Sequence, residues 1–323
     1  MTGSVVADGP LHRTEHEITI AASASEVYQL IADVTRWPVV FGPTVHVEHL
    51  ERSATRERFR IWATAKDEVK TWTSVRELDP VARTIAFRQE VSQPPVARMG
   101  GRWRMEAVAA GRTRVVFGHT YRAIDDDPDS LAWIDEVVDR NSRVELAGLQ
   151  SAAERGRALD ELSLTFEDTV RMAGPRAAAY DFVREAAEWP RRLPHVARLA
   201  LTEDEPGVQV MEMDTIRPDG TVHTTRSVRI CFPQEKIVYK QLVPPALLSA
   251  HTGCWLFEET GDGVAVTSRH TVVVDPEAVP TVLGPGATVA EAQEFARNAL
   301  SRDSMTTLLR AKSFVERARG AAG

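Results

Sequence analysis

The chain repeats its own landmarks at an interval of about 152 residues. The triplet Ser-Val-Arg stands at positions 74–76 and again at 227–229. Other pairs share this order and spacing: Tyr28 with Tyr180, Trp37-Pro38 with Trp189-Pro190, Trp103 with Trp255, and His119 with His270. Because 323 residues is also about two domains' worth of chain, the repeat predicts two domains built on one plan.

The spacing widens toward the end of the chain. The segment DRNSRVELAGLQSAAE at 139–154 matches SRDSMTTLLRAKSFVE at 301–316, an offset of 162. The difference comes from DPEAVPTVLGPGA at 275–287, whose proline and glycine content predicts an inserted loop. We therefore expect domains at residues 11–157 and 158–319.

Each copy opens with the same two periodicities. Alternating polar and apolar residues predict strands at 16–22 and 162–170. Helical patterns follow at 23–34, which a serine caps, and at 174–188, which has a proline near its first turn. We expect the Trp-Pro dipeptide to end each helix, because the residue before a proline favours extended geometry.

A run of short strands and a long helix complete each copy. The first copy has six further alternating segments, near residues 45–52, 56–65, 68–79, 84–90, 98–109 and 113–123. Long helices are expected at about 128–157 and 288–319. This order predicts an α+β architecture, twice over, with an antiparallel sheet wrapped around one helix.

Composition excludes several kinds of partner. A formal net charge of −7 argues against a nucleic-acid surface, which is usually strongly basic. No stretch approaches the ~18 apolar residues that a membrane span needs. Cys231 and Cys254 are too few for a disulfide framework in a chain of this length. We therefore expect no nucleic-acid or membrane partner, and a cytoplasmic location.

The strand that contains Arg76 allows two interpretations. Alternation places Trp72, Ser74 and Arg76 on one face and Val75 on the other. If Val75 faces the core, Arg76 lies in solvent beside a carboxylate. If Trp72, Ser74 and Arg76 face inward, the guanidinium needs a cavity, water or a polar ligand, because burying an unpaired charge costs several kcal/mol. The repetition of Ser and Arg in the second copy makes the two interpretations about equally favoured.

Other motifs give little chemistry. His46 and His49 point to opposite faces of a predicted strand, and no zinc or phosphate-loop motif occurs, so we expect no metal and no cofactor. His119 and His270 lie in ordinary strand sequence and are interpreted as satisfied structural histidines. A Ser-His-Asp triad has no supporting nucleophile-elbow motif.

The ordered set of residues resembles a known family. Trp-Pro after the first helix, Trp-x-Ser-x-Arg in a middle strand, Trp in a later strand and Asn in the last helix are similar to the aromatase/cyclases of bacterial type II polyketide synthases. These proteins have the helix-grip fold of START-like lipid-binding domains. The resemblance covers about residues 11–319, and the duplication matches the di-domain subclass.

The resemblance implies a function, a partner and roles for particular residues. A poly-β-ketone tethered to an acyl carrier protein would undergo first-ring aldol closure, joining carbon seven to carbon twelve, and then lose water, in concert with other synthase enzymes. The implied catalytic residues are Arg76, Ser74, Asn141, Arg229 and Ser227. The implied substrate-binding residues are Trp37, Trp72, Trp103, Trp189, Trp255 and Asp303.

The second copy departs from the family pattern at two positions. Thr225 stands where Trp72 does, and Asp303 stands where Asn141 does. We therefore expect the first pocket to direct ring closure and the second to assist dehydration, hold the chain or support the fold. We also expect Arg76→Ala to give spontaneously cyclised products while the protein stays folded.

Two alternatives remain open from the sequence. A START-like protein that carries a hydrophobic ligand without chemistry would explain the fold and the tryptophans, but it gives no reason for a repeated interior arginine. The second half could also be a structural support for the first. For docking of an acidic carrier protein, the candidates are Arg191 and Arg192, which follow Trp189 and Pro190.

Overall fold

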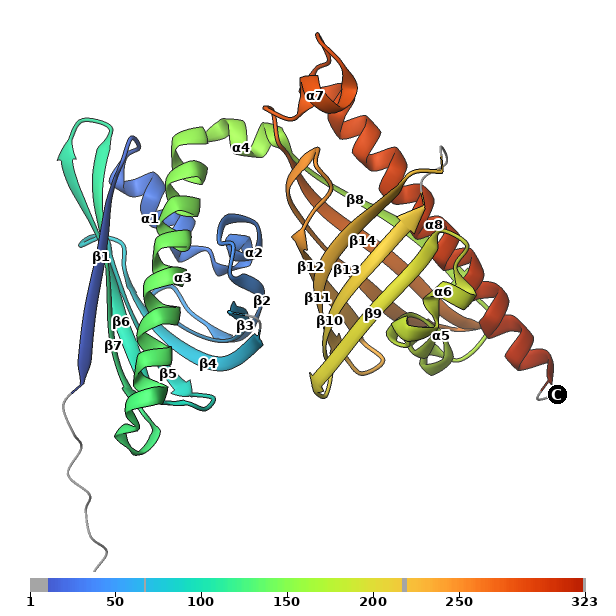
Figure 1. Cartoon of the computed structure of the whole chain (residues 1–323), viewed down its shortest axis with the longest axis horizontal. Helices are drawn as coiled ribbons and strands as arrows, with labels where there is room; N and C mark the ends of the chain where they lie inside the picture. Colours follow the sequence, from blue (N-terminus) through green and yellow to red (C-terminus); the bar gives the residue numbers. More distant parts are fainter. Residues whose placement is uncertain (1–10, 67, 217–219, 322–323) are drawn as a thin grey trace, which may run out of the picture. The chain divides into compact units, whose positions relative to one another are not determined.

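The computed structural model describes residues 11–66, 68–216 and 220–321. The chain divides between Gly156 and Arg157 into two compact units, each with a seven-stranded antiparallel sheet and a long final helix (Figure 1). The predicted α+β class and the tandem helix-grip plan are confirmed. The units separate one residue before the expected boundary.

The first domain contains one sheet, two short helices and one long helix. Its strands are β1 (His12–Ile20), β2 (Thr44–Arg52), β3 (Arg56–Ala65), β4 (Glu68–Asp79), β5 (Thr84–Val91), β6 (Val96–Ala109) and β7 (Arg112–Ala123). Its helices are α1 (Ala24–Ala32), α2 (Trp37–Val40) and α3 (Pro128–Arg155), with single 3-10 turns at Val34–Arg36 and Ile124–Asp126. The strand order β1-β7-β6-β5-β4-β3-β2 is a meander closed by its first strand.

The second domain repeats this order. Its strands are β8 (Ser163–Met172), β9 (Val196–Glu205), β10 (Val208–Ile216), β11 (Val222–Phe232), β12 (Lys236–Val243), β13 (Leu248–Thr260) and β14 (Gly263–Val274). Its helices are α4 (Arg157–Leu162), α5 (Arg176–Arg184), α6 (Trp189–Arg192), α7 (Val279–Leu283) and α8 (Val289–Ala321), with a 3-10 turn at Ala186–Glu188. The sheet order is β8-β14-β13-β12-β11-β10-β9.

Side-chain caps fix where the principal helices begin. Ser23 forms a capping box with Glu26 at the start of α1, and Thr288 makes the same contacts with Glu291 at the start of α8. Asp127 accepts the Ser130 N–H at the start of α3. Each cap satisfies backbone N–H groups that have no intrahelical acceptor.

The prediction that Trp-Pro ends a helix is wrong in both domains. Trp37 has φ −56° and ψ −38°, and Trp189 has φ −57° and ψ −39°, so each is helical and begins a short helix of its own. The proline then lies in the first turn, where its missing N–H would have no intrahelical partner anyway. The preceding α-helix ends five residues before the tryptophan, at Ala32 or Arg184.

The insertion at 275–287 also differs from expectation. It contains the short helix α7, with Pro280 in its first turn and Gly284 (φ 101°) just after its end. A left-handed residue after a helix is the usual place for glycine, so proline and glycine here delimit a helix within the predicted loop.

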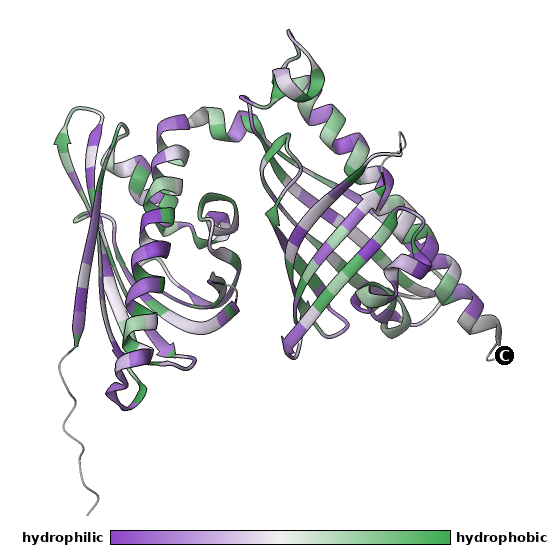
Figure 2. Cartoon of the chain, viewed as in Figure 1, coloured by the Kyte–Doolittle hydropathy of each residue, from purple (hydrophilic) through white to green (hydrophobic). Residues whose placement is uncertain are grey.

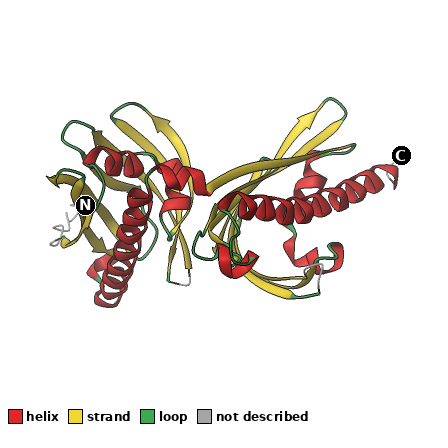
Figure 3. Cartoon of the chain, turned by 90° about the horizontal axis from the view of Figure 1, so that it is seen from above, coloured by secondary structure: helices red, strands yellow, loops and turns green. Residues whose placement is uncertain are grey.

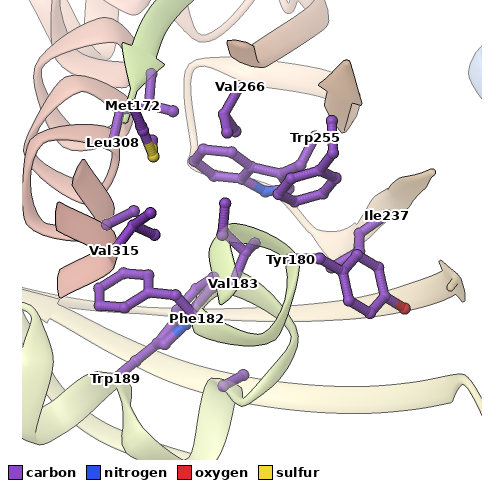
Figure 4. Packing of buried hydrophobic residues seen from close by; sticks show 14 of the residues in the cluster. Met172, Tyr180, Phe182, Val183, Trp189, Ile237, Trp255, Val266, Leu308 and Val315 are labelled. Carbon is purple, nitrogen blue, oxygen red and sulfur yellow. The ribbon is translucent and has the colours of Figure 1, made fainter. Parts of the chain in front are cut away.

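Each long helix covers one face of its own sheet. Figure 3 shows α3 and α8 lying along their sheets, and Figure 2 shows hydrophilic and hydrophobic bands alternating along both helices. In the second domain Leu308 and Val315 of α8 pack with Met172, Phe182 and Val266 in the core (Figure 4). No helix within the described residues is long and apolar enough to cross a bilayer.

One row of cross-strand neighbours crosses each sheet beneath the long helix. In the first domain Glu57, Arg76, Phe87, Gly101 and His119 are paired in sequence from β3 to β7. In the second domain the row reads Gln209, Arg229, Tyr239, Gly253 and His270. The register therefore makes these residues structural equivalents.

Candidate active sites

The first domain encloses a cavity between its sheet and α3. The inner part encompasses about 660 Å³, and an adjoining part of about 720 Å³ reaches Trp133 and Val137 of α3. All six residues that the sequence assigned to this pocket line it: Trp37, Trp72, Ser74, Arg76, Trp103 and Asn141. Of the two interpretations of this strand, the structure shows the one in which Arg76 faces a cavity.

Arg76 is paired as well as buried. Its side chain is 1% exposed, and it contacts the 3% exposed Glu57 through Nη2, while Nε donates to Glu57 Oε1 over 2.7 Å. Nη1 donates to the Ile31 carbonyl (2.8 Å), and Nη2 to the Ala32 carbonyl (2.7 Å), at the end of α1. These four contacts with described residues leave one of five N–H donors, on Nη1, for a ligand.

Aromatic rings and hydrogen bonds hold the rest of this wall. The Arg76 guanidinium lies 4.9 Å from the Trp37 ring centroid, within cation–π range. Trp103 stacks on Phe117 with 3.4 Å between centroids. Asn141 donates to the Thr64 carbonyl over 3.0 Å, so α3 is tied to the edge of the sheet beside the cavity.

Two titratable residues in this cavity are missing from the predicted site. Glu145 is half-buried four residues after Asn141 on α3, and desolvation raises its pKa to about 8. It is therefore mostly protonated at neutral pH and can donate a proton. His119 also lines the cavity, and burial lowers its pKa to about 3, which leaves a neutral imidazole.

The interpretation of His119 as a satisfied structural histidine is wrong. Its Nδ1 is buried and has no hydrogen-bond partner among the described residues. The neighbouring rings of Phe87 and Phe117 supply no hydrogen-bonding atom, because both side chains are hydrocarbon. A polar ligand or water in the cavity is the partner that this nitrogen lacks.

The second domain encloses a similar cavity of about 790 Å³ between its sheet and α8. The five residues assigned to this pocket line it: Trp189, Ser227, Arg229, Trp255 and Asp303. Figure 4 shows Trp189 and Trp255 projecting into the same core. Thr225, which replaces Trp72, also lines the cavity, so the wall is more polar there.

Arg229 is buried without a carboxylate partner in direct contact among the described residues. Nη1 donates to Gln209 Oε1 (2.9 Å), and Nη2 donates to the Val183 carbonyl (2.6 Å). Gln209 in turn donates to Glu203 Oε2 over 2.8 Å, so the nearest negative charge is one residue removed. Burial lowers the pKa of Arg229, yet a guanidinium stays protonated in proteins, so this cavity wall keeps a positive charge.

The polar residues of this cavity gather around His270. Its Nδ1 lies 2.8 Å from the Tyr239 hydroxyl and 3.0 Å from His251 Nε2. Its Nε2 lies 2.6 Å from the Ser304 hydroxyl and 3.1 Å from that of Ser268. The interpretation of His270 as satisfied is thus correct, but the ring lies in the cavity wall.

Comparison of the two copies could have found these residues in the sequence. His251 stands where the first copy has Met99, and Gln209 stands where it has Glu57. Glu145 follows Asn141 by one helical turn and so shares its face. Within the described residues no group of three or more His, Cys, Asp or Glu side chains is placed to hold a metal ion.

Known proteins resemble this chain over nearly its whole length. Residues 12–154 match the family described as polyketide cyclase / dehydrase and lipid transport. The granaticin polyketide synthase bifunctional cyclase/dehydratase of Streptomyces violaceoruber is 48% identical over 309 residues, 95% of this chain and 95% of that protein. The actinorhodin polyketide synthase bifunctional cyclase/dehydratase of Streptomyces coelicolor is 48% identical over 307 residues, 92% of this chain and 95% of that protein.

Solved structures agree with these relatives. The di-domain ARO/CYC BexL from the BE-7585A biosynthetic pathway has a TM-score of 0.83 and 53% identity, covering 94% of this chain and 99% of that one. StfQ, the di-domain ARO/CYC of the steffimycin pathway, has a TM-score of 0.82 and 38% identity, covering 95% and 99%. The chain is therefore an enzyme of the di-domain aromatase/cyclase family, the bifunctional cyclase/dehydratases of bacterial type II polyketide synthases.

Proposed function

We propose that this enzyme closes and aromatises the first ring of a poly-β-ketone carried by an acyl carrier protein, joining carbon seven to carbon twelve. The observation that carries the proposal is the first cavity, where a buried guanidinium and a protonated carboxyl group share tryptophan-walled space. A carrier of hydrophobic ligands would need neither group. The position of the new bond rests on the family resemblance.

Ring closure needs an enolate, a polarised carbonyl and one favoured chain conformer. The aromatic wall formed by Trp37, Trp72 and Trp103 restricts the flexible chain, which brings the reacting carbons together. The free Nη1 donor of Arg76 faces the oxygen that gains charge as the bond forms. A preorganised donor of this kind contributes roughly two to three orders of magnitude in rate.

Glu145 completes the proton transfers in this cavity. In its protonated form it gives a proton to the new alkoxide, which yields the β-hydroxy ketone, and the resulting carboxylate can then accept one. The neutral His119 is a second acceptor for the proton that leaves carbon at enolisation. Asn141 and Ser74 hold the wall, since their side chains bond to the Thr64 and Arg88 carbonyls.

The second cavity acts after ring closure in this proposal. Its predicted residues Ser227, Arg229 and Asp303 place polar groups in the lining, and Trp189 and Trp255 supply its aromatic wall. Carrier-protein docking, participation with other synthase enzymes and a cytoplasmic location stay predictions. The relatives named above are polyketide synthase components, which is what supports them.

The test is a reconstituted type II polyketide synthase that forms a carrier-bound poly-β-ketone, analysed by mass spectrometry with and without this protein. We expect the product skeleton to change from spontaneously cyclised compounds to one with an aromatic first ring. Isotope labelling of the acetate units then locates the new bond. Unchanged skeletons, with polyketide merely retained on the protein, would overturn the proposal in favour of a carrier.

A further inference from the structure

Three members of the His270 cluster differ from the residues at the equivalent places in the first domain, although His270 itself is matched by His119. Tyr239 occupies the place of Phe87, and His251 the place of Met99. Ser268, opposite Trp255, occupies the place of Phe117, opposite Trp103. Three apolar side chains of the first cavity are thus replaced by hydrogen-bonding ones.

Gly253 makes room for this arrangement. A Cβ atom at Gly253 would lie 2.5 Å from the Tyr239 hydroxyl oxygen, closer than non-bonded atoms approach. Tyr239 therefore lies across the glycine, and its hydroxyl reaches His270 on the strand beyond. Gly101 has the same relation to Phe87 in the first domain, so the glycine is common to both sheets and the hydroxyl group of Tyr239 is what the second domain adds.

The contacts at His270 are the basis on which we assign the position of its proton. Desolvation raises the pKa of Tyr239 and keeps its phenol protonated, so its hydroxyl can donate to Nδ1, and we assign the contact in that direction. His270 Nδ1 is then an acceptor, and in this assignment its single lone pair is shared by the Tyr239 O–H and the N–H of His251 Nε2, which lies 3.0 Å away. The proton of His270 lies on Nε2 and is donated to Ser304.

This tautomer leaves His251 Nδ1 with a free lone pair. The atom is buried and has no hydrogen-bond partner among the described residues, and His251 lines the cavity. Desolvation, with a smaller contribution from His270, holds the pKa of His251 well below its usual value. Desolvation likewise lowers the pKa of His270 to about 4, so both rings are neutral bases at neutral pH.

Other groups in the same cavity also lack partners. Buried atoms of three further lining residues have no hydrogen-bond partner in the described part of the chain: Trp189 Nε1, His195 Nδ1 and Gln241 Oε1. Such atoms are costly to bury unless a ligand or water satisfies them. Together with the positive charge of Arg229, they indicate a polar ligand with oxygen atoms.

We infer that the second cavity is a dehydration site, in which His251 transfers a proton and Arg229 stabilises an enolate formed from the cyclised β-hydroxy ketone. The inference rests on the proposed function, because ring closure supplies this substrate. His270, Tyr239 and Ser304 are positioning residues that keep the lone pair on His251 Nδ1. The site is distinct from the first cavity, which makes the new carbon–carbon bond.

The reaction needs no added reagent. His251 Nδ1 removes a proton from the carbon next to the carbonyl, and the electron pair of that bond forms an enolate whose oxygen faces Arg229. As the carbonyl re-forms, this pair becomes the carbon–carbon double bond and the carbon–oxygen bond to the hydroxyl group breaks. The departing hydroxide takes the proton back from His251 and leaves as water.

The test compares His251→Met and Tyr239→Phe with the wild type in the reconstituted synthase. Each substitution reproduces the class of side chain at the equivalent position of the first domain. A general base contributes roughly two to four orders of magnitude, so His251→Met is expected to slow water loss at least about a hundredfold. Tyr239→Phe removes one orienting hydrogen bond and is expected to slow it about tenfold.

The pattern of products separates a chemical role from a structural one. In both variants the cyclised compound should accumulate with its hydroxyl group retained and its ring pattern unchanged. Thr271→Val is the matched control, since Thr271 follows His270 but bonds to Thr165 over 2.9 Å on the exposed side. Thermal unfolding shows whether each variant is folded.

Two results would overturn the inference. If His251→Met loses water as fast as the wild type, the second cavity is not the dehydration site. If a folded His251→Met changes which carbons are joined, this cavity closes the ring instead. Failure of the wild type itself to alter the skeleton would refute the proposed function, and is seen before any variant is made.

Discussion

Arg76 and Arg229 stand at the same place on equivalent strands, and both are 1% exposed, but they have different partners. Arg76 contacts the carboxylate of Glu57, so the pair is neutral. Arg229 contacts the neutral amide of Gln209, so its charge is less compensated. One substitution at a cross-strand neighbour therefore changes the electrostatic character of a cavity while the fold stays the same.

The two cavities also differ in the side chains that can donate or accept a proton. The first cavity carries the protonated carboxyl group of Glu145 on α3, where the second has Thr307. The second carries His251 and Tyr239, where the first has the apolar side chains of Met99 and Phe87. In the first cavity, a proton donor beside a neutral ion pair can protonate an alkoxide. In the second cavity, a neutral base beside a cation can form an enolate and stabilise its charge. The difference between the domains is thus one of chemistry within a shared scaffold.

The largest expected effect is a loss of stability, which should be greater for a substitution of Arg76 than for the same substitution of Arg229. Arg76→Ala breaks the buried ion pair and leaves Glu57 with only the His49 ring, 3.0 Å from Oε2, which costs about 3–5 kcal/mol, so the first domain should unfold far more easily. This contradicts the sequence-based expectation that the variant stays folded. Arg229→Ala leaves only neutral groups, at about 1–3 kcal/mol. Calorimetry of both variants measures the difference.

Glu57→Gln is the control for this comparison. It gives Arg76 the neutral amide partner that Arg229 already has, so the domain should be destabilised less than by Arg76→Ala. Equal loss of stability in Arg76→Ala and Arg229→Ala would mean that the ion pair does not distinguish the domains.

The next effect concerns the proton donor that only the first domain has. Glu145→Gln keeps the shape of the side chain but cannot release a proton, so ring closure should slow about a hundredfold. Single-turnover analysis of carrier-bound substrate measures the rate. Glu136→Gln, on the same helix, changes only a surface ion pair with Lys66 and should leave the rate unchanged. A normal rate for Glu145→Gln would place the proton donor elsewhere.

The same carboxyl group should make stability depend on pH. Folding raises the pKa of Glu145 from 4.5 to about 8, so the folded state binds its proton more tightly than the unfolded state. Its contribution is fully present below about pH 4.5 and is lost as the pH rises through about 8. Between these values Tm should fall by a few degrees more in the wild type than in Glu145→Gln. If Tm changes with pH in the same way in both proteins, the carboxyl group of Glu145 is well solvated.

The smallest expected effect concerns an exposed arginine that only the second domain has at this position. Arg191 is 77% exposed after Trp189 and Pro190, whereas the first domain has Val39 at the equivalent position. Both arginines have carboxylate partners, Glu188 for Arg191 and Glu185 for Arg192, but Arg192 is less exposed and lies 5.2 Å from the Phe182 ring. Arg191→Glu should weaken turnover of carrier-bound substrate a few-fold, mainly at low salt. Insensitivity to both charge and salt would move docking to another surface.

The sequence by itself determined the duplication and the α+β class, and it left two interpretations of the inward face of β4 open. Repetition at a fixed spacing and alternation of side chains are local properties, so they can be read without coordinates. The family resemblance supplied the eleven predicted site residues, and all of them line one cavity or the other. The family resemblance added the reaction type.

Only the tertiary structure decided what each side chain contacts. Glu57 and Arg76 are 19 residues apart, and His251 and Ser304 approach His270 from another strand and from α8, so no local pattern predicts these contacts. The pKa of Glu145 likewise depends on the walls around it and not on its neighbours in sequence. The prediction for Trp-Pro was wrong because the residue before a proline can be helical when that proline lies in the first turn of a new helix. Burial and partner choice arise when distant segments meet, and they set the chemistry of each cavity.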